Sequence, residues 1–448
     1  MIEPSVSGGW RVSEEAFWKV NPDLFSNLKI RASYGSLGNG NVSPYSFLEL
    51  LSISTSGRVL NGLKNKYTSA PAVMPDGLTW ETATTTDVGL DFGMLNNRLQ
   101  FNGDYYIRKT TDMYTVGETL PDVFGASSPK GNYADMTTKG WEITLTWRDQ
   151  FTLAEKPFNY EIRGTLSDYI STIDRYNNQT GNLDDYYAGK RVGEIWGYVT
   201  EGLFKDQADI DSHADQTLIQ SSSKRITYPG DVKIKDLNGD HVIDYGNNTV
   251  DDHGDKTVIG NALPRYAYSI NLSGDWNNFF LSAFFQGVGK QDWYPSSECI
   301  FWGQYNRPYN NMPTWHQGNY WTEDNTDAYL PRYAGYNASL KSTPQTRYLQ
   351  NVAYIRLKNL QFGYTLPQPI VSKAKLQNVR VYISAENLWC WSPLYKHTRD
   401  LDVTNIYGSD PDLTDADMSS GLNGNRGSGD GNSYPQMKSV SLGLSVTF

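Results

Sequence analysis

The chain has 448 residues and a formal net charge of −10, and it contains 31 Tyr, 13 Trp and 16 Phe. No run of about 18 apolar residues occurs, which excludes a membrane protein built from helices. The acidic balance excludes a nucleic-acid-binding protein, because contacts with phosphates require clustered positive charge. A transmembrane β-barrel is compatible with the mean hydropathy of −0.55, since its strands show apolar residues to lipid only at every second position.

Alternation of apolar and polar residues predicts ten β-strands, because successive side chains of a strand point to opposite faces. The predicted strands occupy residues 28–37, 79–95, 98–112, 138–150, 157–171, 264–276, 279–290, 352–366, 377–391 and 436–448. A further strand is predicted at 3–13. In the last segment, the residues predicted to face lipid are Val440, Leu442, Leu444, Val446 and Phe448. The residues predicted to face the lumen are Ser441, Gly443, Ser445 and Thr447.

The connections between these strands alternate strictly in length. The long ones are 38–78, 113–137, 172–263, 291–351 and 392–435. Two of the short ones centre on Asn96-Asn97 and Asn277-Asn278, pairs that favour two-residue hairpin turns. Outer-membrane barrels have long extracellular loops and short periplasmic turns, so we expect all five long loops at one end of the sheet. A soluble β-sandwich or propeller is the alternative, but neither fold requires long loops at only one end.

The strand at 352–366 changes phase part-way along its length. Ile355 and Leu357 lie on the odd-numbered face, whereas Leu360, Phe362 and Tyr364 lie on the even-numbered face, one residue out of phase. A β-bulge near Lys358-Asn359 would restore the alternation. The alternative is that the strand leaves the membrane at this point.

One loop contains a motif of closely spaced oxygen ligands. Asp236, Asn238, Asp240 and Asp244 occupy positions 1, 3, 5 and 9 of an EF-hand-like calcium loop, and Val242 offers its carbonyl at position 7. Calcium prefers several converging oxygens, and this spacing lets one turn supply them. The motif therefore predicts a structural Ca²⁺ that orders an extracellular loop.

The match to that motif is incomplete. Position 6, usually Gly, is His241, and position 12, usually Glu, is Asn247. Asp251, Asp252 and Asp255 follow and could replace the missing carboxylate. The alternative is a solvated acidic loop that uses Asp and Asn for its turns.

The long loop at 291–351 is rich in aromatic residues, among them Trp302, Tyr305, Trp315 and Trp321. An aromatic ring can stack on the C–H face of a sugar, and Trp and Tyr also carry a polar group. These four residues are therefore predicted to bind substrate. The alternative is that the rings pack within the loop or contact a partner protein.

No arrangement of nucleophile, general base or metal-binding cysteines accompanies these motifs. Cys299 and Cys390 have no CxxC spacing and are expected to be unpaired, with a disulfide as the alternative. The chain is therefore predicted not to be an enzyme. Two alternatives stay open, a secreted glycan-binding β protein and a glycosidase with two carboxylates across a cleft.

Seven segments in fixed order span nearly the whole chain. They are SVSGGWRVSEEAF (5–17), NLKIRASYGSLGN (27–39), LTWETATTTDVGLDF (78–92), GDVKIKDLNGD (230–240), YIRLKNLQFGYTLP (354–367), VRVYISAENLW (379–389) and YPQMKSVSLGLSVTF (434–448). Together they resemble the SusC/RagA family of TonB-dependent outer-membrane transporters.

The resemblance implies an all-β fold, an antiparallel transmembrane β-barrel of about 22 strands filled by an N-terminal plug. Residues 1–448 would then be one unit, the C-terminal half of the barrel with about 10 or 11 strands, and the plug and first strands would be absent. The implied function is TonB-dependent import of oligosaccharide, or of peptide, across the outer membrane. The implied partners are a SusD-like surface lipoprotein and, through the missing front part, the TonB complex.

Overall fold

The computed structural model describes residues 3–40, 48, 51–69, 73, 77–117, 123, 128–220, 226–295, 299–305, 311–333, 343–404, 406 and 436–448. Most of the predicted loop at 392–435 lies outside these residues. Within them, no helix has both the length and the apolar character needed to cross a membrane.

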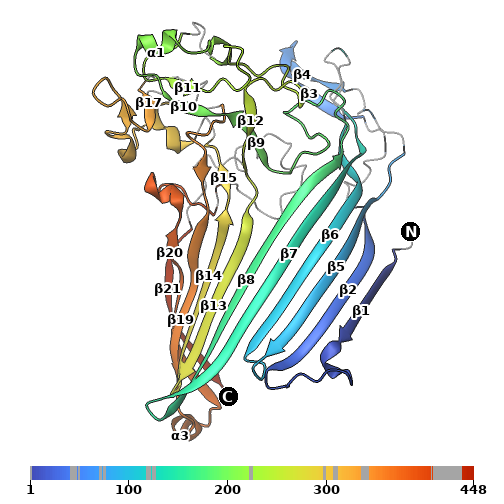
Figure 1. Ribbon diagram of the computed structural model, residues 1–448, viewed down its shortest axis with the longest axis vertical. Coiled ribbons are helices and arrows are strands. Elements are labelled where there is room, and N and C mark those ends of the chain that lie inside the picture. Colours follow the sequence, from blue (N-terminus) through green and yellow to red (C-terminus); the bar gives the residue numbers. More distant parts are fainter. Residues whose placement is uncertain are drawn as a thin grey trace.

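Eleven strands form one antiparallel sheet in which every strand pairs with its neighbours in chain order (Figure 1). They are β1 (Ser5–Arg11), β2 (Phe25–Asn39), β5 (Glu81–Met94), β6 (Leu99–Val116), β7 (Lys130–Leu153), β8 (Lys156–Arg175), β13 (Arg265–Trp276), β14 (Phe279–Lys290), β19 (Tyr354–Thr365), β20 (Asn378–Trp391) and β21 (Ser439–Thr447). All eleven predicted strands are present. The paired strands β6 and β7 extend well into the predicted 113–137 loop, which is correspondingly shorter.

The loops contain smaller elements that periodicity did not predict. The strands are β3 (Ile53–Leu60), β4 (Leu63–Thr68), β9 (Glu194–Tyr198), β10 (Thr200–Leu203), β11 (Val232–Ile234), β12 (Lys256–Asn261), β15 (Asp292–Trp293), β16 (Tyr320–Trp321), β17 (Leu330–Arg332) and β18 (Gln350–Asn351). The helical turns are η1 (Val12–Glu14), α1 (Gln207–Asp211), η3 (Thr217–Ile219), η4 (Ile300–Tyr305), η5 (Thr314–His316), α3 (Gln368–Val371), η6 (Ser372–Ala374) and η7 (Pro393–Lys396).

The described parts of the long connections lie at one end of the sheet, which is the upper end in Figure 1. The short connections, including α3, lie at the opposite end. An antiparallel meander places alternate connections at opposite ends, so the predicted topology is confirmed.

The short turns show how local sequence joins the strands. Asn277 and Asn278 have φ of 47° and 69° and join Trp276 directly to Phe279, as a two-residue turn with two left-handed residues requires. The predicted two-residue turn at Asn96-Asn97 is wrong. Met94 pairs with Leu99, so the turn has four residues, and Leu95, Asn96 and Asn97 are all left-handed.

The register shows which side chains share a face of the sheet. One row of directly opposed residues is apolar and runs through Phe151, Phe158, Trp276, Phe279, Tyr364, Val381 and Leu444. The neighbouring row, on the opposite face, runs through Gln150, Asn159, Asp275, Phe280, Gly363, Tyr382 and Gly443. The two predicted faces of the last strand are therefore confirmed, with Leu444 in the apolar row and Gly443 in the other.

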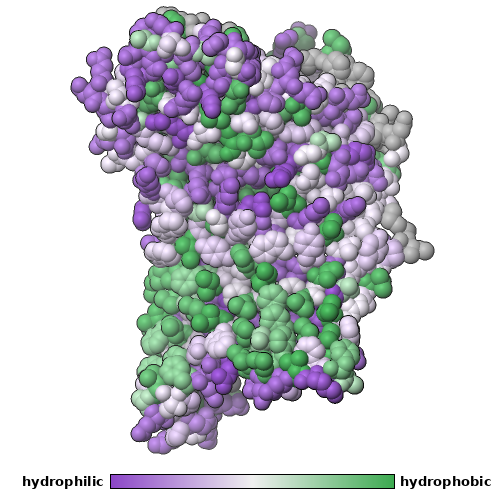
Figure 2. All heavy atoms as spheres, in the orientation of Figure 1, coloured by the Kyte–Doolittle hydropathy of each residue, from purple (hydrophilic) through white to green (hydrophobic). Residues whose placement is uncertain are grey.

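The apolar face forms a band across the lower part of the sheet (Figure 2). At its lower edge the rings of Phe151 and Phe158 stack 5.0 Å apart, and at its upper edge Tyr105 lies opposite Trp141. Ten residues of β7 separate Phe151 from Trp141, which is about 33 Å along a strand and about 25 Å along the normal of a barrel tilted by about 40°. That height matches the outward apolar band of an outer-membrane barrel.

On the opposite face, glycines lie beside large aromatic rings of the neighbouring strand. A Cβ added to Gly443 would lie 2.3 Å from the ring of Tyr382, and one added to Gly363 would lie 2.6 Å from the ring of Phe280. Gly140 has the same relation to Tyr106, at 2.5 Å. Each ring therefore lies over a glycine, so these large side chains lie close to the sheet and protrude little from its polar face.

The predicted bulge in β19 is confirmed. Phe284 of β14 pairs with Asn359, whereas the next residue, Phe285, pairs with Leu357, which leaves Lys358 as the extra residue. The bulge returns the apolar residues on both sides of it to the same face.

The two faces predict different tolerance of charge at neighbouring positions of β7. Leu145 lies on the apolar face near the middle of the band, and Thr144 lies on the polar face opposite Asn102. In the full-length protein, Leu145→Arg is expected to destabilise the barrel by about 2–4 kcal/mol, because it places a cation near the bilayer midplane. Thr144→Arg, the matched control, is expected to fold. Heat-modifiable gel migration measures folding, and failure of the Thr144 variant alone would show that the faces are reversed.

Candidate functional site

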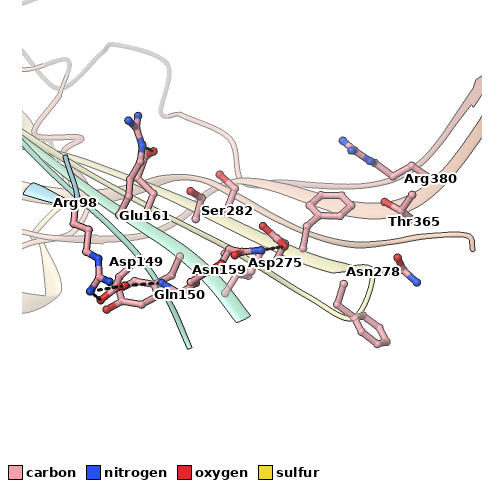
Figure 3. A pocket seen from close by; sticks show the side chains of 17 residues that line it. Arg98, Asp149, Gln150, Asn159, Glu161, Asp275, Asn278, Ser282, Thr365 and Arg380 are labelled. Carbon is pink, nitrogen blue, oxygen red and sulfur yellow. Dashed lines mark hydrogen bonds and ion pairs between the residues drawn. The ribbon is translucent and has the colours of Figure 1, made fainter. Parts of the chain in front are cut away.

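The polar face forms a hollow of about 960 Å³ at the end of the sheet that carries the short turns (Figure 3). Most of its charged groups are paired: Arg98 contacts Asp149 at 3.3 Å, and Asn159 donates a 2.8 Å hydrogen bond to Asp275. Arg380 instead lies over the ring of Phe280, with its guanidinium carbon 4.6 Å from the ring centre. In a barrel this face lines the lumen.

A second charged group lies further along the same face, on β2, β5 and β6. Arg31 makes ion pairs of 2.8 Å with both Asp91 and Asp104. Gly89 permits this approach, since a Cβ there would lie 2.4 Å from a carboxylate oxygen of Asp104. Sequence reasoning missed these groups, because the pairing depends on the register between strands and not on spacing along the chain.

Above the sheet, the described parts of three long loops share one apolar core. Buried residues from the loops after β8, β14 and β20 include Ile243, Phe301, Trp302, Leu330 and Leu401. An ion pair joins two of these loops, with Arg332 Nε 2.7 Å from a carboxylate oxygen of the buried Asp231. The loops therefore fold as a unit, which we call the loop cluster.

Two of the four predicted substrate-binding residues lie inside the loop cluster. Trp302 is 1% exposed and Tyr305 is 2% exposed. The Trp302 indole donates a hydrogen bond to Pro295 O at 3.2 Å, and the Tyr305 hydroxyl donates one to Pro331 O at 2.7 Å. Neither ring offers a face to a ligand in this arrangement, so both residues support the cluster from within.

The other two predicted residues, Trp315 and Trp321, are only partly buried. The ring of Trp315 packs 5.0 Å from that of Phe301 and 5.6 Å from that of His397. A role in substrate binding stays a prediction for both tryptophans.

His316 is a buried histidine next to this aromatic group. It is fully buried, and its Nε2 lies 2.9 Å from Phe301 O. Burial lowers the pKa of His316 to about 4, although the hydrogen bond to the carbonyl opposes the change. The side chain is therefore neutral at neutral pH and donates from Nε2.

The predicted calcium loop is a compact turn held by its own side chains. Asp236 accepts hydrogen bonds from the amides of Gly239 and His241, at 2.6 and 2.9 Å. His241, at the position where the motif usually has glycine, adopts the left-handed conformation with φ 65°. These amides lower the pKa of Asp236, which keeps its carboxylate charged.

The ends of this loop are braced from inside by Asp255. Its carboxylate is fully buried and accepts hydrogen bonds from the amides of Leu237, at 2.7 Å, and Asp244, at 3.0 Å. In the part of the chain that the structure describes, no group of three or more His, Cys, Asp or Glu side chains is arranged to hold a metal ion. Asn238 and the Val242 carbonyl are ligand types outside that set, and calcium binding stays a prediction.

Neither cysteine forms a disulfide bond. Cys299 is buried in the core of the loop cluster, and Cys390 lies half-buried on β20. The expectation that no disulfide joins them is confirmed.

Comparison with known proteins places the chain among outer-membrane receptors. No family model matches it. TonB-dependent receptors P3 and P26 of Formosa agariphila are 29% and 27% identical to it over 99% of its length. The TonB-dependent receptor SusC of Bacteroides thetaiotaomicron is 23% identical over 99% of the chain. The chain is similar over nearly its whole length to TonB-dependent receptors, SusC among them.

A solved structure with the same fold is that of the RagAB peptide transporter, at 20% identity and a TM-score of 0.66. The match covers 87% of this chain and 39% of that one. The predicted fold class is confirmed as an antiparallel outer-membrane β-barrel, here represented by eleven strands. The chain spans about two-fifths of the SusC-like relatives, 42% of P3 and P26 and 40% of SusC.

The calcium prediction can be tested on the full-length protein by calorimetry. Asp236→Ala together with Asp240→Ala is expected to abolish a Ca²⁺-binding site, because both carboxylates are proposed ligands. Glu323→Ala with Asp324→Ala removes the same charge from another loop and should leave binding unchanged. Equal Ca²⁺ binding by the Asp236/Asp240 variant and the wild type would rule out this loop.

The buried histidine predicts a pH dependence of the loop cluster. The folded pKa of His316 is about 4 and the unfolded value is 6.5, so the unfolded state binds the proton more tightly. The contribution of neutral His316 to the free energy of unfolding is therefore fully present above about pH 6.5. It is lost as the pH drops towards 4, by about 3 kcal/mol in total.

Protease sensitivity of the loop cluster between pH 7 and pH 4 measures this effect. His316→Gln keeps a donor for Phe301 O and should flatten the pH dependence, whatever its effect at pH 7. His241→Asn, at an exposed histidine, is the control and should keep the wild-type slope. An unchanged slope in the His316 variant would contradict the assignment.

Proposed function

We propose that this chain forms wall and extracellular loops of a transporter that imports oligosaccharide across the outer membrane by TonB-dependent transport. Peptide is the alternative cargo. The proposal rests on one observation, a sheet with an apolar and a polar face, where the described parts of three long loops share one core at one end. That architecture separates a lipid-facing wall from a lumen and covers one mouth of the lumen.

The lumen face supplies the polar surface that a hydrated cargo requires. The Arg98–Asp149 pair of the hollow is neutral, and Arg31 with its two aspartates carries one net negative charge. Ion pairing leaves this face with little free charge, which favours a neutral polar cargo over a strongly ionic one, because an unpaired charge would retain an oppositely charged solute.

Selectivity is assigned to the loop cluster. Of the four residues predicted to bind substrate, Trp315 and Trp321 are only partly buried in the loop cluster. Their rings could stack on the C–H faces of sugars. Their burial on one side lets the cluster hold each ring in a fixed orientation. A glycan cargo fits this arrangement better than a peptide cargo does.

Two partner proteins are proposed to act together with this chain. A SusD-like surface lipoprotein would close over the loop cluster, and the TonB complex would act through the plug. In this proposal the chain catalyses no reaction. A secreted glycan-binding protein or glycosidase would have to cover the apolar band, where Leu442 and Leu444 are 79% and 66% exposed.

Uptake by cells that carry the full-length receptor tests the proposal. Labelled oligosaccharides should enter only with an intact proton gradient, and Trp315→Ala with Trp321→Ala should reduce uptake about tenfold through loss of stacking. Tyr186→Ala, at an exposed ring outside the aromatic group, is the control. Uptake of labelled peptides but not of oligosaccharides would replace the proposed cargo with the alternative. Uptake that survives collapse of the gradient would overturn TonB-dependent import.

A further inference from the structure

Two exposed lysines lie on the apolar face of the sheet, immediately above the upper edge of the band. Going up β6 and β7, Tyr105 lies opposite Trp141, then Ile107 opposite Lys139, then Lys109 opposite Thr137. Lys109 and Lys139 are thus diagonal neighbours on one face, with side chains about 7–8 Å apart at their bases. The aromatic pair marks the membrane interface, so both ammonium groups are at the level of the outer-leaflet headgroups.

Neither lysine has an ion-pair partner among the described residues. That distinguishes them from four arginines of the same sheet, although Arg108 of β6 and Arg163 of β8 also have no ion-pair partner among the described residues. Arg31, Arg148, Arg175 and Arg265 each make an ion pair with a carboxylate. The nearby Asp168 is held by Arg265, and Asp174 accepts the hydroxyl of Thr137 at 2.5 Å. Asp168 is balanced by Arg265, whereas the bond from Thr137 leaves the charge of Asp174 in place, so the two lysines and Asp174 together offer one net positive charge to an external anion.

Hydroxyl groups surround the lysines in the same row of the sheet. The row runs across five strands through Ser36, Thr84, Lys109, Thr137 and Thr172. Thr137 donates its hydroxyl to Asp174, and Ser36 and Thr84 share one hydrogen bond, so these groups offer mainly oxygen acceptors to the hydroxyls of a sugar.

An apolar hollow lies directly below the lysines. It has a volume of about 430 Å³ and centres on Gly103, between Leu90, Tyr105 and Ile143. Gly103 lies opposite Ile143, one row below the aromatic pair. The ring of Phe101 lies over Gly103, 2.7 Å from where a Cβ would be, and forms part of the lining of the hollow.

We infer that this surface is a binding site for an anionic glycolipid of the outer leaflet. The phosphate of the headgroup would contact Lys109 and Lys139, its sugar would contact the threonine hydroxyls, and one acyl chain would occupy the hollow at Gly103. Going down the sheet, the lysines come first, then the aromatic pair, then the apolar hollow. This order matches that of the phosphorylated headgroup and the acyl chains in such a lipid. The site faces lipid and not the lumen, so it goes beyond the proposed transport function and does not depend on the cargo.

Lipid binding to the full-length receptor in nanodiscs, measured by native mass spectrometry, tests the site. The probes are diphosphorylated lipid A and the same lipid without phosphates. The wild type should bind the phosphorylated form about tenfold more tightly, and Lys109→Gln with Lys139→Gln should lose this preference. Lys64→Gln with Lys66→Gln, in the exposed β3–β4 hairpin, removes the same charge and should keep it.

Three results would overturn the inference. One is an equal preference in the Lys109/Lys139 variant and the wild type, with folding verified by heat-modifiable migration. Another is a wild type that does not distinguish the two lipids. The third is displacement of the lipid by millimolar inorganic phosphate alone, which would show a site for free anions without a contribution from the hollow.

Discussion

Backbone hydrogen bonding in hydrocarbon is the constraint on which this structure depends. An unpaired N–H or C=O group in lipid costs several kcal/mol, so a spanning strand must be paired along both edges. The long ladders of this sheet, such as the pairing of β7 with β8 from Leu153 to Asp135, meet that requirement for the nine strands between β1 and β21. Once the ladders are fixed, the alternation of side chains assigns every residue to lipid or lumen, and the lengths of the loops can vary freely above them.

The same constraint explains what the sequence could predict. Leu442, Leu444 and their polar neighbours alternate because one face must be apolar, and that pattern can be read from the chain without a structure. The Asn277-Asn278 turn was also predictable, since asparagine tolerates the left-handed conformation. The two-residue turn at Ala154-Glu155, with φ of 46° and 62°, has no such residue and gave no signal.

The charged groups of the lumen and the interior of the loop cluster could not be predicted in this way. Arg31 meets Asp91 and Asp104 across two strand interfaces, so their proximity follows from register. Trp302 and Tyr305 were predicted to bind substrate because they are aromatic residues in a long loop. They are buried because the loops are long enough to build a core of their own, as a small soluble domain does. Loop length thus indicated function less reliably than strand pattern indicated fold.

The glycines that lie under aromatic rings have a consequence for assembly. A shift of one residue between β20 and β21 would replace Gly443 opposite Tyr382 by Leu442 or Leu444, whose side chains belong to the other face. The ring would then meet a side chain where it now has open backbone, and the same conflict would arise at Gly363 and Gly140. These glycines therefore favour the native register of the paired strands over a register shifted by one residue. A misaligned hairpin is penalised before the barrel closes, when it can still separate and pair again.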